Sequence, residues 1–163
     1  MFAWSHGDMV GISLSVIMHT LHLDKSVPAK SQKQRRLGTT RAEALEEEVA
    51  QLLKCGFIRE AKFPIWVVNP VLVLKPNGKW RTCIDFSDLN KACPKDCFPL
   101  PRIDQLVDAT MGHELMSFMD AYSGYNQIAM NPAEQEHTSF MTPTNVYCYK
   151  VMPFGLKNAG ATY

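Results

Sequence analysis

The residue in this sequence best suited to chemistry is an aspartate that follows an apolar run. Asp120 comes directly after residues 115–119, which are mostly apolar, and is followed by Ala121 and a stretch rich in Tyr and Ser. An ionised carboxylate is costly to bury without a cation, so this position indicates a hard metal ion or an Arg partner. An Asp that caps the next helical turn explains the same position, and spacing alone does not separate the two.

A second candidate site is a group of cations around a predicted turn. Lys75, Lys79 and Arg81 surround it, and no acidic residue lies between Lys62 and Asp85. Such cations can bind phosphate groups, and Arg adds bidentate geometry. The alternative is an exposed turn that charge keeps soluble.

Three further patterns are weaker candidates for a functional site. Cys93 and Cys97 are not spaced like a zinc-binding pair, and no second pair follows. His19 and His22 have no carboxylate at metalloprotease spacing, so we interpret them as structural. Residues 155–160 have the glycine spacing of a phosphate loop but lack the Lys-Ser/Thr that completes one.

The elements that must position these residues begin with a helix. Thr40 and Glu43 form a predicted capping box, and apolar residues then recur at helical spacing. Gly56 ends the helix at a position typical of left-handed backbone. Residues 25–41 before it carry six bases and no acid, which predicts an extended, solvated connector.

Strand patterns follow the helix. Residues 65–86 alternate around a Pro-Asn-Gly turn at 76–78 and predict a β-hairpin, in which Pro70 marks a break or an edge. A second hairpin is predicted over 138–149.

Between these hairpins the sequence predicts a short helix from Ile103 to Gly112, with Asp104 and Asp108 facing water, and a buried strand over 115–119. Another helix begins near residue 163. Strands and helices mixed in this way indicate an α+β fold.

Composition is compatible with one globular domain and with a nucleic-acid partner. The 163 residues are 46% hydrophobic and carry a formal net charge of +1. Residues 25–102 hold 15 Lys or Arg and 8 Asp or Glu, a charge of +7, whereas residues 103–163 hold 2 and 6, a charge of −4. Five scattered cysteines favour reduced thiols in an intracellular compartment, and we expect no membrane association.

Three strings of the sequence together resemble a known family. They are FAWSHGDMVGI at 2–12, the run from GFIREAKFPIW to GYNQIAM at 56–130, and YCYKVMPFGLKNAGATY at 147–163. In their order and spacing they resemble the reverse transcriptase region of plant gypsy-type long-terminal-repeat retrotransposons.

The resemblance implies a right-hand polymerase fold. It implies a protease-to-polymerase connector at 1–39, a fingers-like part at 40–115 and a partial palm at 116–163, in which residues 138–163 partly return to the fingers, with the thumb absent. Asp120 would be catalytic and a metal ligand, and Tyr125 would be the aromatic gate that excludes a ribose. The remaining implied roles are nucleotide binding for Lys75, Arg81, Ala121, Phe154 and Gly155, and template or primer contact for Lys79 and Lys157.

The same resemblance implies cofactors and partners. The complete enzyme would use two Mg²⁺ or Mn²⁺ ions, an RNA or DNA template-primer and a deoxynucleoside triphosphate. The rest of the Pol polyprotein would supply protease, thumb, RNase H and integrase. The expected location is intracellular, in a cytoplasmic particle, the nucleus or both.

One departure from the family pattern shapes the functional prediction. The family's second metal-binding motif contains an Asp-Asp pair, and this sequence has none. Since ligands that act as a unit are not replaceable one by one, we expect this polypeptide not to polymerise by itself. The alternatives are a non-catalytic module that binds nucleic acid or nucleotide, and an unfinished domain that does not fold stably.

Overall fold

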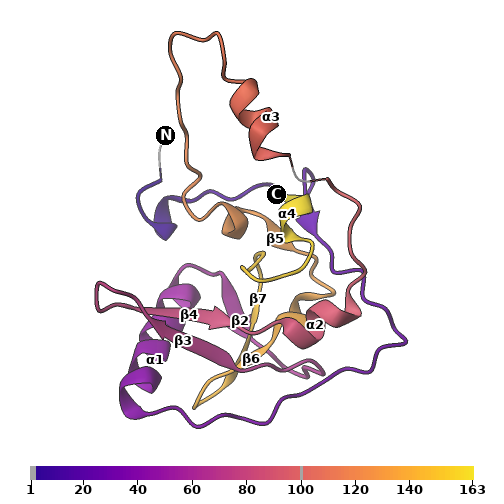
Figure 1. Cartoon of the computed structure of the whole chain (residues 1–163). Coiled ribbons are helices and arrows are strands. Elements are labelled where there is room, and N and C mark those ends of the chain that lie inside the picture. Colours follow the sequence, from indigo (N-terminus) through magenta and orange to yellow (C-terminus); the bar gives the residue numbers. More distant parts are fainter. Residues whose placement is uncertain (1–2, 100) are drawn as a thin grey trace.

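The computed structural model describes residues 3–99 and 101–163, and it has the mixed α+β architecture that the sequence predicts (Figure 1). Four α-helices, three short 3-10 helices and seven strands are found in these residues. In chain order the elements are η1 (His6–Asp8), β1 (Met18–His19), α1 (Thr39–Lys54), β2 (Ile58–Glu60), β3 (Pro70–Leu74), β4 (Trp80–Ile84), α2 (Ser87–Ala92), α3 (Ile103–Asp108), η2 (Gly124–Gln127), β5 (Ala129–Met130), η3 (Gln135–Thr138), β6 (Phe140–Met141), β7 (Val146–Tyr149) and α4 (Ala159–Thr162).

The strands form three small sheets. β3 and β4 make an antiparallel hairpin, and β2, β7 and β6 make an antiparallel sheet in that order. β1 pairs with β5 in parallel, so Met18 lies opposite Ala129. The β1–β5 pairing places the N-terminal segment beside the chain that follows Asp120.

Helix α1 buries one face, including Leu45 and Val49. Its N-cap is Gly38, without a side-chain hydrogen bond, so the predicted capping box at Thr40 is wrong: Thr39 and Thr40 already lie inside the first turn. Gly56 has φ +71° and ends the helix as predicted. Within the described residues, neither α1 nor another helix has the length and apolar character that a membrane crossing requires.

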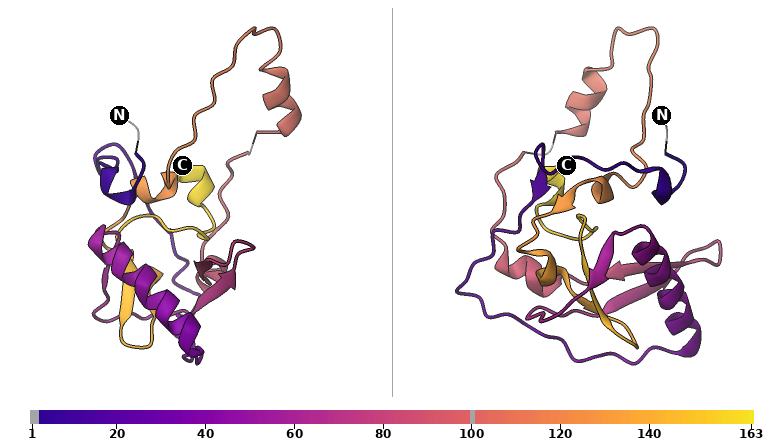
Figure 2. Two further views of the ribbon diagram at one scale, coloured as in Figure 1. Left: turned by 90° about the vertical axis from the view of Figure 1, so that its left-hand side faces the viewer. Right: turned by 180° about the vertical axis from the view of Figure 1, so that it is seen from behind.

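The first predicted hairpin is confirmed, and its turn projects beyond the rest of the chain (Figures 1 and 2). Pro70 is the first residue of β3, a position where a strand tolerates the missing N–H. The apolar residues before it do not extend the strand. Val67 and Val68 instead make single bridges to Ser31 and Phe140.

The second predicted hairpin, β6–β7, is confirmed and closes the hydrophobic core. We call the packed part of the chain, residues 3–99 and 123–163, the body. Fully buried side chains of α1, α2, β5, β6 and the loop after β7 include Leu45, Leu89, Met130, Phe140 and Met152.

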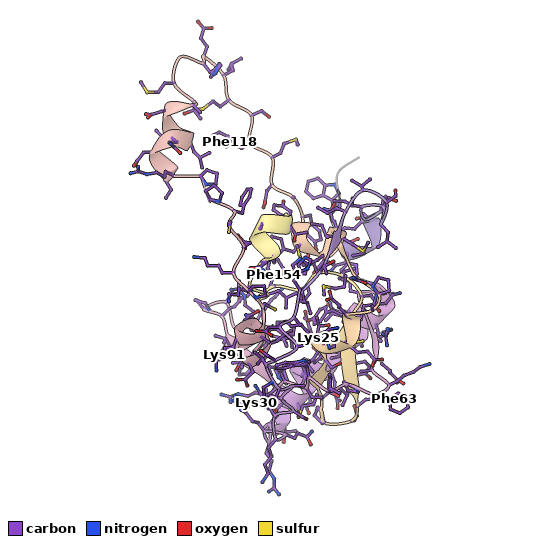
Figure 3. The ribbon with its side chains drawn as sticks, turned by 90° about the vertical axis from the view of Figure 1, so that its right-hand side faces the viewer. Lys25, Lys30, Phe63, Lys91, Phe118 and Phe154 are labelled. Carbon is purple, nitrogen blue, oxygen red and sulfur yellow. The ribbon has the colours of Figure 1, made fainter. Side chains whose placement is uncertain are left out.

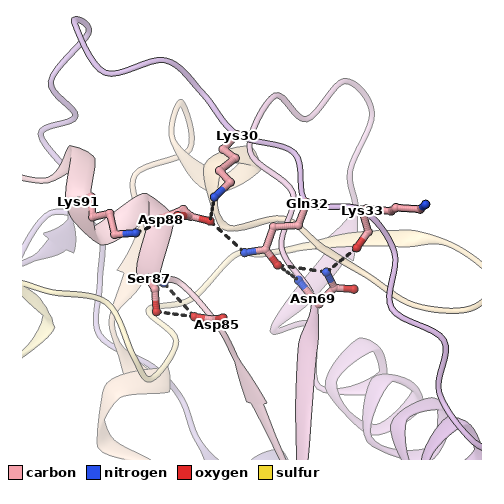
Figure 4. A network of polar contacts seen from close by, with 8 residues as sticks. All are labelled: Lys30, Gln32, Lys33, Asn69, Asp85, Ser87, Asp88 and Lys91. Carbon is pink, nitrogen blue, oxygen red and sulfur yellow. Dashed lines mark hydrogen bonds and ion pairs between the residues drawn. The ribbon is translucent and has the colours of Figure 1, made fainter.

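The basic connector is extended as predicted up to Gly38, whereas residues 39–41 already belong to α1, and a buried asparagine attaches it to the body (Figure 4). Asn69 is 2% exposed. Its Nδ2 donates to Gln32 Oε1 at 3.1 Å and to the Lys33 carbonyl at 3.0 Å, and its Oδ1 accepts from the Arg35 backbone N–H at 2.9 Å. Because each polar atom of this buried side chain has a partner, the connector follows one path across the body.

Residues 101–122, which we call the arm, leave the body and return to it (Figures 1 and 2). Every residue of the arm is exposed. The predicted short helix is present as α3, with Asp104 and Asp108 in water. Phe118 is 85% exposed and stands on the arm, clear of the body (Figure 3).

The predicted buried strand over 115–119 is wrong, because these residues form no strand and are exposed. A strand gains its hydrogen bonds only from a neighbour. Each hairpin carries that neighbour within a few residues, whereas no strand of the described residues pairs with 115–119.

Candidate nucleotide site

Three aromatic rings meet near the C-terminal end of the arm. Tyr125, on η2, is stacked on Phe154 with ring centroids 4.9 Å apart and an interplanar angle of 26°. The ring of Tyr163 also contacts Tyr125, with ring centroids 5.0 Å apart and an interplanar angle of 60°. The structure therefore brings together Tyr125 and Phe154, two residues that the resemblance assigns to nucleotide binding.

Gly155 follows Phe154 and shapes the loop that carries it. Its φ of +96° is one that residues with a Cβ rarely adopt. The Gly155 carbonyl accepts a hydrogen bond from Asn90 Nδ2 at 2.8 Å, and Asn90 Oδ1 accepts one from the Lys157 backbone N–H at 2.9 Å. Asn90 of α2 thus holds this loop at both sides of Leu156.

The ammonium group of Lys157 is engaged within the body. It donates to the Cys93 carbonyl at 2.7 Å and to the Asn90 carbonyl at 3.3 Å, both at the C-terminal end of α2. Cations are favoured at that end of a helix. This contact gives Lys157 a structural partner, and a contact with template or primer stays a prediction.

Asp120 and Ala121 lie in the exposed coil at the end of the arm. The chain then turns at Ser123, with φ +47°, and Asn126 fixes the turn through its N–H to the Ser123 carbonyl at 2.9 Å and its Nδ2 to Ser123 Oγ at 2.8 Å. The turn connects Asp120 to Tyr125. No group of three or more His, Cys, Asp or Glu that could hold a metal ion exists among the described residues.

The second predicted cluster lies on the projecting hairpin. The Lys75 N–H donates to the Lys79 carbonyl at 2.8 Å, and Gly78 turns the chain with φ +76°. Lys79 and Arg81 are exposed, and Lys75 is half-buried. None of these three cations forms an ion pair within residues 3–99 and 101–163, so their charge is available to a phosphate.

A polar cleft of about 400 Å³ lies between the connector and the base of this hairpin. Asp88 lines this cleft, and its carboxylate lies 3.0 Å from Lys30 Nζ and 3.2 Å from Lys91 Nζ (Figure 4). Hydrogen bonds from Lys30 and then Gln32 lower the pKa of Asp88 to about 2. Asp85 beside it accepts from the Ser87 hydroxyl, which lowers its pKa. These carboxylates are therefore ionised and satisfied by local donors.

The cysteine and histidine candidates have structural surroundings. Cys93 is buried and Cys97 exposed, and burial raises the pKa of the Cys93 thiol. His19 is 1% exposed, with Nδ1 2.7 Å from Thr162 Oγ1. This contact agrees with a structural interpretation of His19.

Comparison with known sequences decides the family. The sequence model of one family, described as reverse transcriptase (RNA-dependent DNA polymerase), matches residues 73–163, more than half of the chain. The chain belongs to the reverse transcriptase family.

Its relatives among curated proteins include two transposon polyproteins. One is the retrovirus-related Pol polyprotein from transposon 297 of Drosophila melanogaster, 32% identical over 91% of this chain. Another is the transposon Tf2-3 polyprotein of Schizosaccharomyces pombe, 33% identical over 74% of this chain. The chain spans 14% and 9% of these two relatives, so it corresponds to a small part of each.

Solved reverse transcriptases share the fold. The protease-reverse transcriptase of prototype foamy virus matches with a TM-score of 0.76 at 20% identity, covering 87% of this chain and 19% of that one. A foamy viral protease-reverse transcriptase in complex with double-stranded DNA matches with a TM-score of 0.71 at 21% identity, covering 88% of this chain and 24% of that one. The α+β fold of this chain therefore matches that of the corresponding part of these reverse transcriptases.

The structure adds residues that sequence reasoning missed. A Cβ on Gly124 would lie 2.7 Å from the Tyr163 hydroxyl, so a larger residue at this position would displace the Tyr163 ring. Asn90 and Tyr163 complete the surroundings of the Phe154 loop and of Tyr125. These partners are far apart in sequence and follow no periodicity, so no local pattern predicts them.

Proposed function

We propose that this chain is part of the reverse transcriptase of a plant gypsy-type long-terminal-repeat retrotransposon, and that it binds nucleotide and template-primer. The observation that carries the proposal is the stack of Tyr125 on Phe154 close in sequence to Asp120. An aromatic ring offers a nucleoside a flat apolar contact, and a nearby carboxylate suits a metal ion that accompanies phosphates.

In this proposal the nucleotide occupies the surface between the aromatic pair and the hairpin cations. Tyr125 packs under the sugar, with Ala121, Phe154 and Gly155 around it, and Asp120 is the metal ligand. Lys75 and Arg81 bind the triphosphate, and Lys79 and Lys157 contact template or primer. Residues 40–115 act as fingers, 116–163 as the first part of a palm, and 1–39 as the connector from a protease.

The residues present do not fit two metal ions. In a complete site, bound Mg²⁺ or Mn²⁺ would supply charge neutralisation at the transferred phosphate and activation of the attacking hydroxyl. Holding two ions takes several carboxylates, whereas Asp120 belongs to no ligand group within the described residues. We therefore propose that the chain alone does not polymerise, and that thumb, RNase H and integrase regions act with it in a polyprotein.

Primer extension tests this proposal. The chain is incubated with an RNA template, a DNA primer, deoxynucleoside triphosphates and Mg²⁺ or Mn²⁺, and we expect no incorporation above background. Incorporation that Asp120→Asn abolishes would contradict the statement that the chain is inactive alone.

A second candidate is a module that binds nucleic acid without catalysis. It is favoured by Lys75, Lys79 and Arg81 around the β3–β4 turn, which form no ion pair with any residue that the structure describes. Each phosphate contact adds about one to the slope of log affinity against log salt concentration. Arg81→Ala should reduce that slope by about one, and Lys54→Ala, on the last turn of α1, should leave it unchanged. Metal-dependent nucleotide binding that is lost with Asp120→Asn favours the first candidate, part of a reverse transcriptase. Salt-sensitive nucleic-acid binding that Asp120→Asn leaves unchanged favours the second, non-catalytic candidate.

The proposed function also gives a context and a cellular location for this chain. The relatives are polyproteins of mobile elements, which supports a Pol polyprotein as the context of this chain. The proposed location is intracellular, in a cytoplasmic particle, the nucleus or both.

A further inference from the structure

The N-terminal segment forms a closed hook beside the loop of Asp120. We call residues 4–12 the hook, and the 3-10 helix η1 lies within it. Asp8 Oδ2 accepts hydrogen bonds from the Trp4 N–H at 3.1 Å, the Ser5 N–H at 2.9 Å and the Ser5 hydroxyl at 2.8 Å. The Ser5 hydroxyl bond is the largest cause of the lowered pKa of Asp8. The hook is therefore held by its own carboxylate.

One side chain of the hook joins the loop of Asp120 to the body. The His6 ring lies edge-on to Phe57, with centroids 5.4 Å apart and planes at 88°. Its other neighbour is Tyr122, at 5.3 Å and 57°. Phe57 is buried beside β2, and Tyr122 comes two residues after Asp120. His6 thus lies between a fixed residue of the body and the site loop.

A second link runs through the backbone. The Ile12 N–H donates to the Gln127 carbonyl at 2.8 Å, and Gln127 Nε2 donates to the Tyr122 carbonyl at 3.3 Å. The hook consequently contacts both ends of the segment from Tyr122 to Gln127, which contains the turn at Ser123 and the ring of Tyr125.

This position matters because the described residues of the arm before Asp120, 101–119, do not pack on the body. Residues 101–119 are all exposed, so the body restrains the Asp120 loop from its C-terminal side. On that side His6 packs on Tyr122, and the Gly124 N–H donates to the Ala121 carbonyl at 3.1 Å. The Asp8 carboxylate is used within the hook, and no metal-ligand group exists among the described residues, so the hook acts by packing.

We propose that His6 is a positioning residue for the nucleotide site: it packs Tyr122 against Phe57 and so holds the loop from Asp120 to Tyr125 in place. The inference rests on the proposed function in taking this loop as a nucleotide-binding element. Aromatic pairs of this geometry contribute modestly, so loss of the imidazole should weaken nucleotide binding roughly 2- to 10-fold.

The test compares the whole chain with three variants. His6→Ala removes the ring, and His6→Phe keeps an aromatic ring in its place. Trp4→Ala is the matched control, because Trp4 belongs to the same hook, is 85% exposed and contributes its backbone N–H to Asp8 in either form. Hydrogen exchange of residues 120–127 reports the loop, and equilibrium binding of labelled dTTP with Mn²⁺ reports the site.

We expect His6→Ala to speed exchange in 120–127 and weaken dTTP binding, with melting temperature and salt-sensitive RNA binding unchanged. His6→Phe should restore both properties, and Trp4→Ala should alter neither. Faster exchange without weaker dTTP binding, or equal effects of His6→Ala and Trp4→Ala, overturns the proposal. If the unaltered chain binds no dTTP, the proposed function fails, and exchange alone then decides whether His6 holds the loop.

Discussion

The body and the arm each contain a short helix with a leucine, but only the helix of the body is packed. Helices α2 and α3 are both six residues long, and each carries a leucine near its middle. Leu89 of α2 is completely buried, whereas Leu106 of α3 is 54% exposed. Apolar content therefore does not decide which segment packs.

The availability of a partner decides it. α2 packs under the Phe154 loop, which Asn90 holds, and β3 is followed by β4 after a short turn. Residues 115–119 are as apolar as β3 but have no pairing strand among the described residues. The strands of the body each have a pairing strand, some of them far apart in sequence, whereas residues 115–119 have none among the described residues and lie exposed.

The largest expected contrast is between matched alanine substitutions. Leu89→Ala should lower the free energy of unfolding by about 2–5 kcal/mol, because it removes a fully buried side chain and leaves a cavity. Leu106→Ala should change it by less than about 0.5 kcal/mol. Denaturant titration followed by Trp fluorescence measures both, since Trp66 is buried in the same core.

A cost above about 1 kcal/mol for Leu106→Ala would contradict the comparison, because an exposed leucine has no such packing to lose. It would mean that α3 is packed in solution, either on the body or on another copy of the chain.

The same contrast explains how far the sequence predicts the structure. The Pro76-Asn77-Gly78 turn and the Gly56 helix end are local signals, and both are confirmed. The helix start at Thr40 is wrong by a residue or two, as helix boundaries often are. Interpreting 115–119 as a strand fails because periodicity records which residues are apolar and not whether a neighbour is present.

The residues of the candidate site likewise fall into those that the sequence predicts and those that only the folded chain reveals. Tyr125 and Phe154 could be singled out from their strings, and the structure brings them together. Tyr163 beneath Gly124, Asn90 at Gly155 and His6 at Tyr122 depend on contacts between distant segments. Residue type gives no sign of such contacts, so they became visible only in the folded chain.

Limited proteolysis measures how readily the arm and the body open locally. Phe118 on the arm and Phe154 in the body are both exposed, and chymotrypsin can cleave after either (Figure 3). The loop of Phe154 is held by Asn90 and by the stack on Tyr125, whereas nothing packs on Phe118 in the described residues. Since cleavage requires an opened backbone, cutting after Phe118 should be faster by on the order of 100-fold.

Mass spectrometry of the early fragments identifies the site. Equal initial rates at Phe118 and Phe154 would show that side-chain exposure, and not packing, governs cleavage. Phe118→Ala should then slow only the cut in the arm, and it serves as the control for the assignment of fragments.

The smallest expected effect is the pH dependence of stability that His19 of the body contributes, compared with His113 of the arm. Burial is the largest cause that lowers the pKa of His19 from its ordinary 6.5; His22 adds to it and Glu134 opposes it. The unfolded chain therefore takes up a proton at His19 before the folded chain does. This contribution to stability is complete above pH 6.5 and is lost as pH falls below 6.5 towards the folded pKa, at most about 1.4 kcal/mol per pH unit.

Thermal melts between pH 8 and pH 5 test this contribution through His19→Gln and, on the arm, His113→Gln. His19→Gln should flatten the loss of stability below pH 6.5, and His113→Gln should leave it unchanged because His113 is exposed. Some slope should remain in both variants, since burial also lowers the pKa of His137. Asp88, with a pKa of about 2, loses its charge only in a lower pH range, so it does not obscure the comparison. An identical slope in both variants would mean that His19 is no better buried in solution than a residue of the arm.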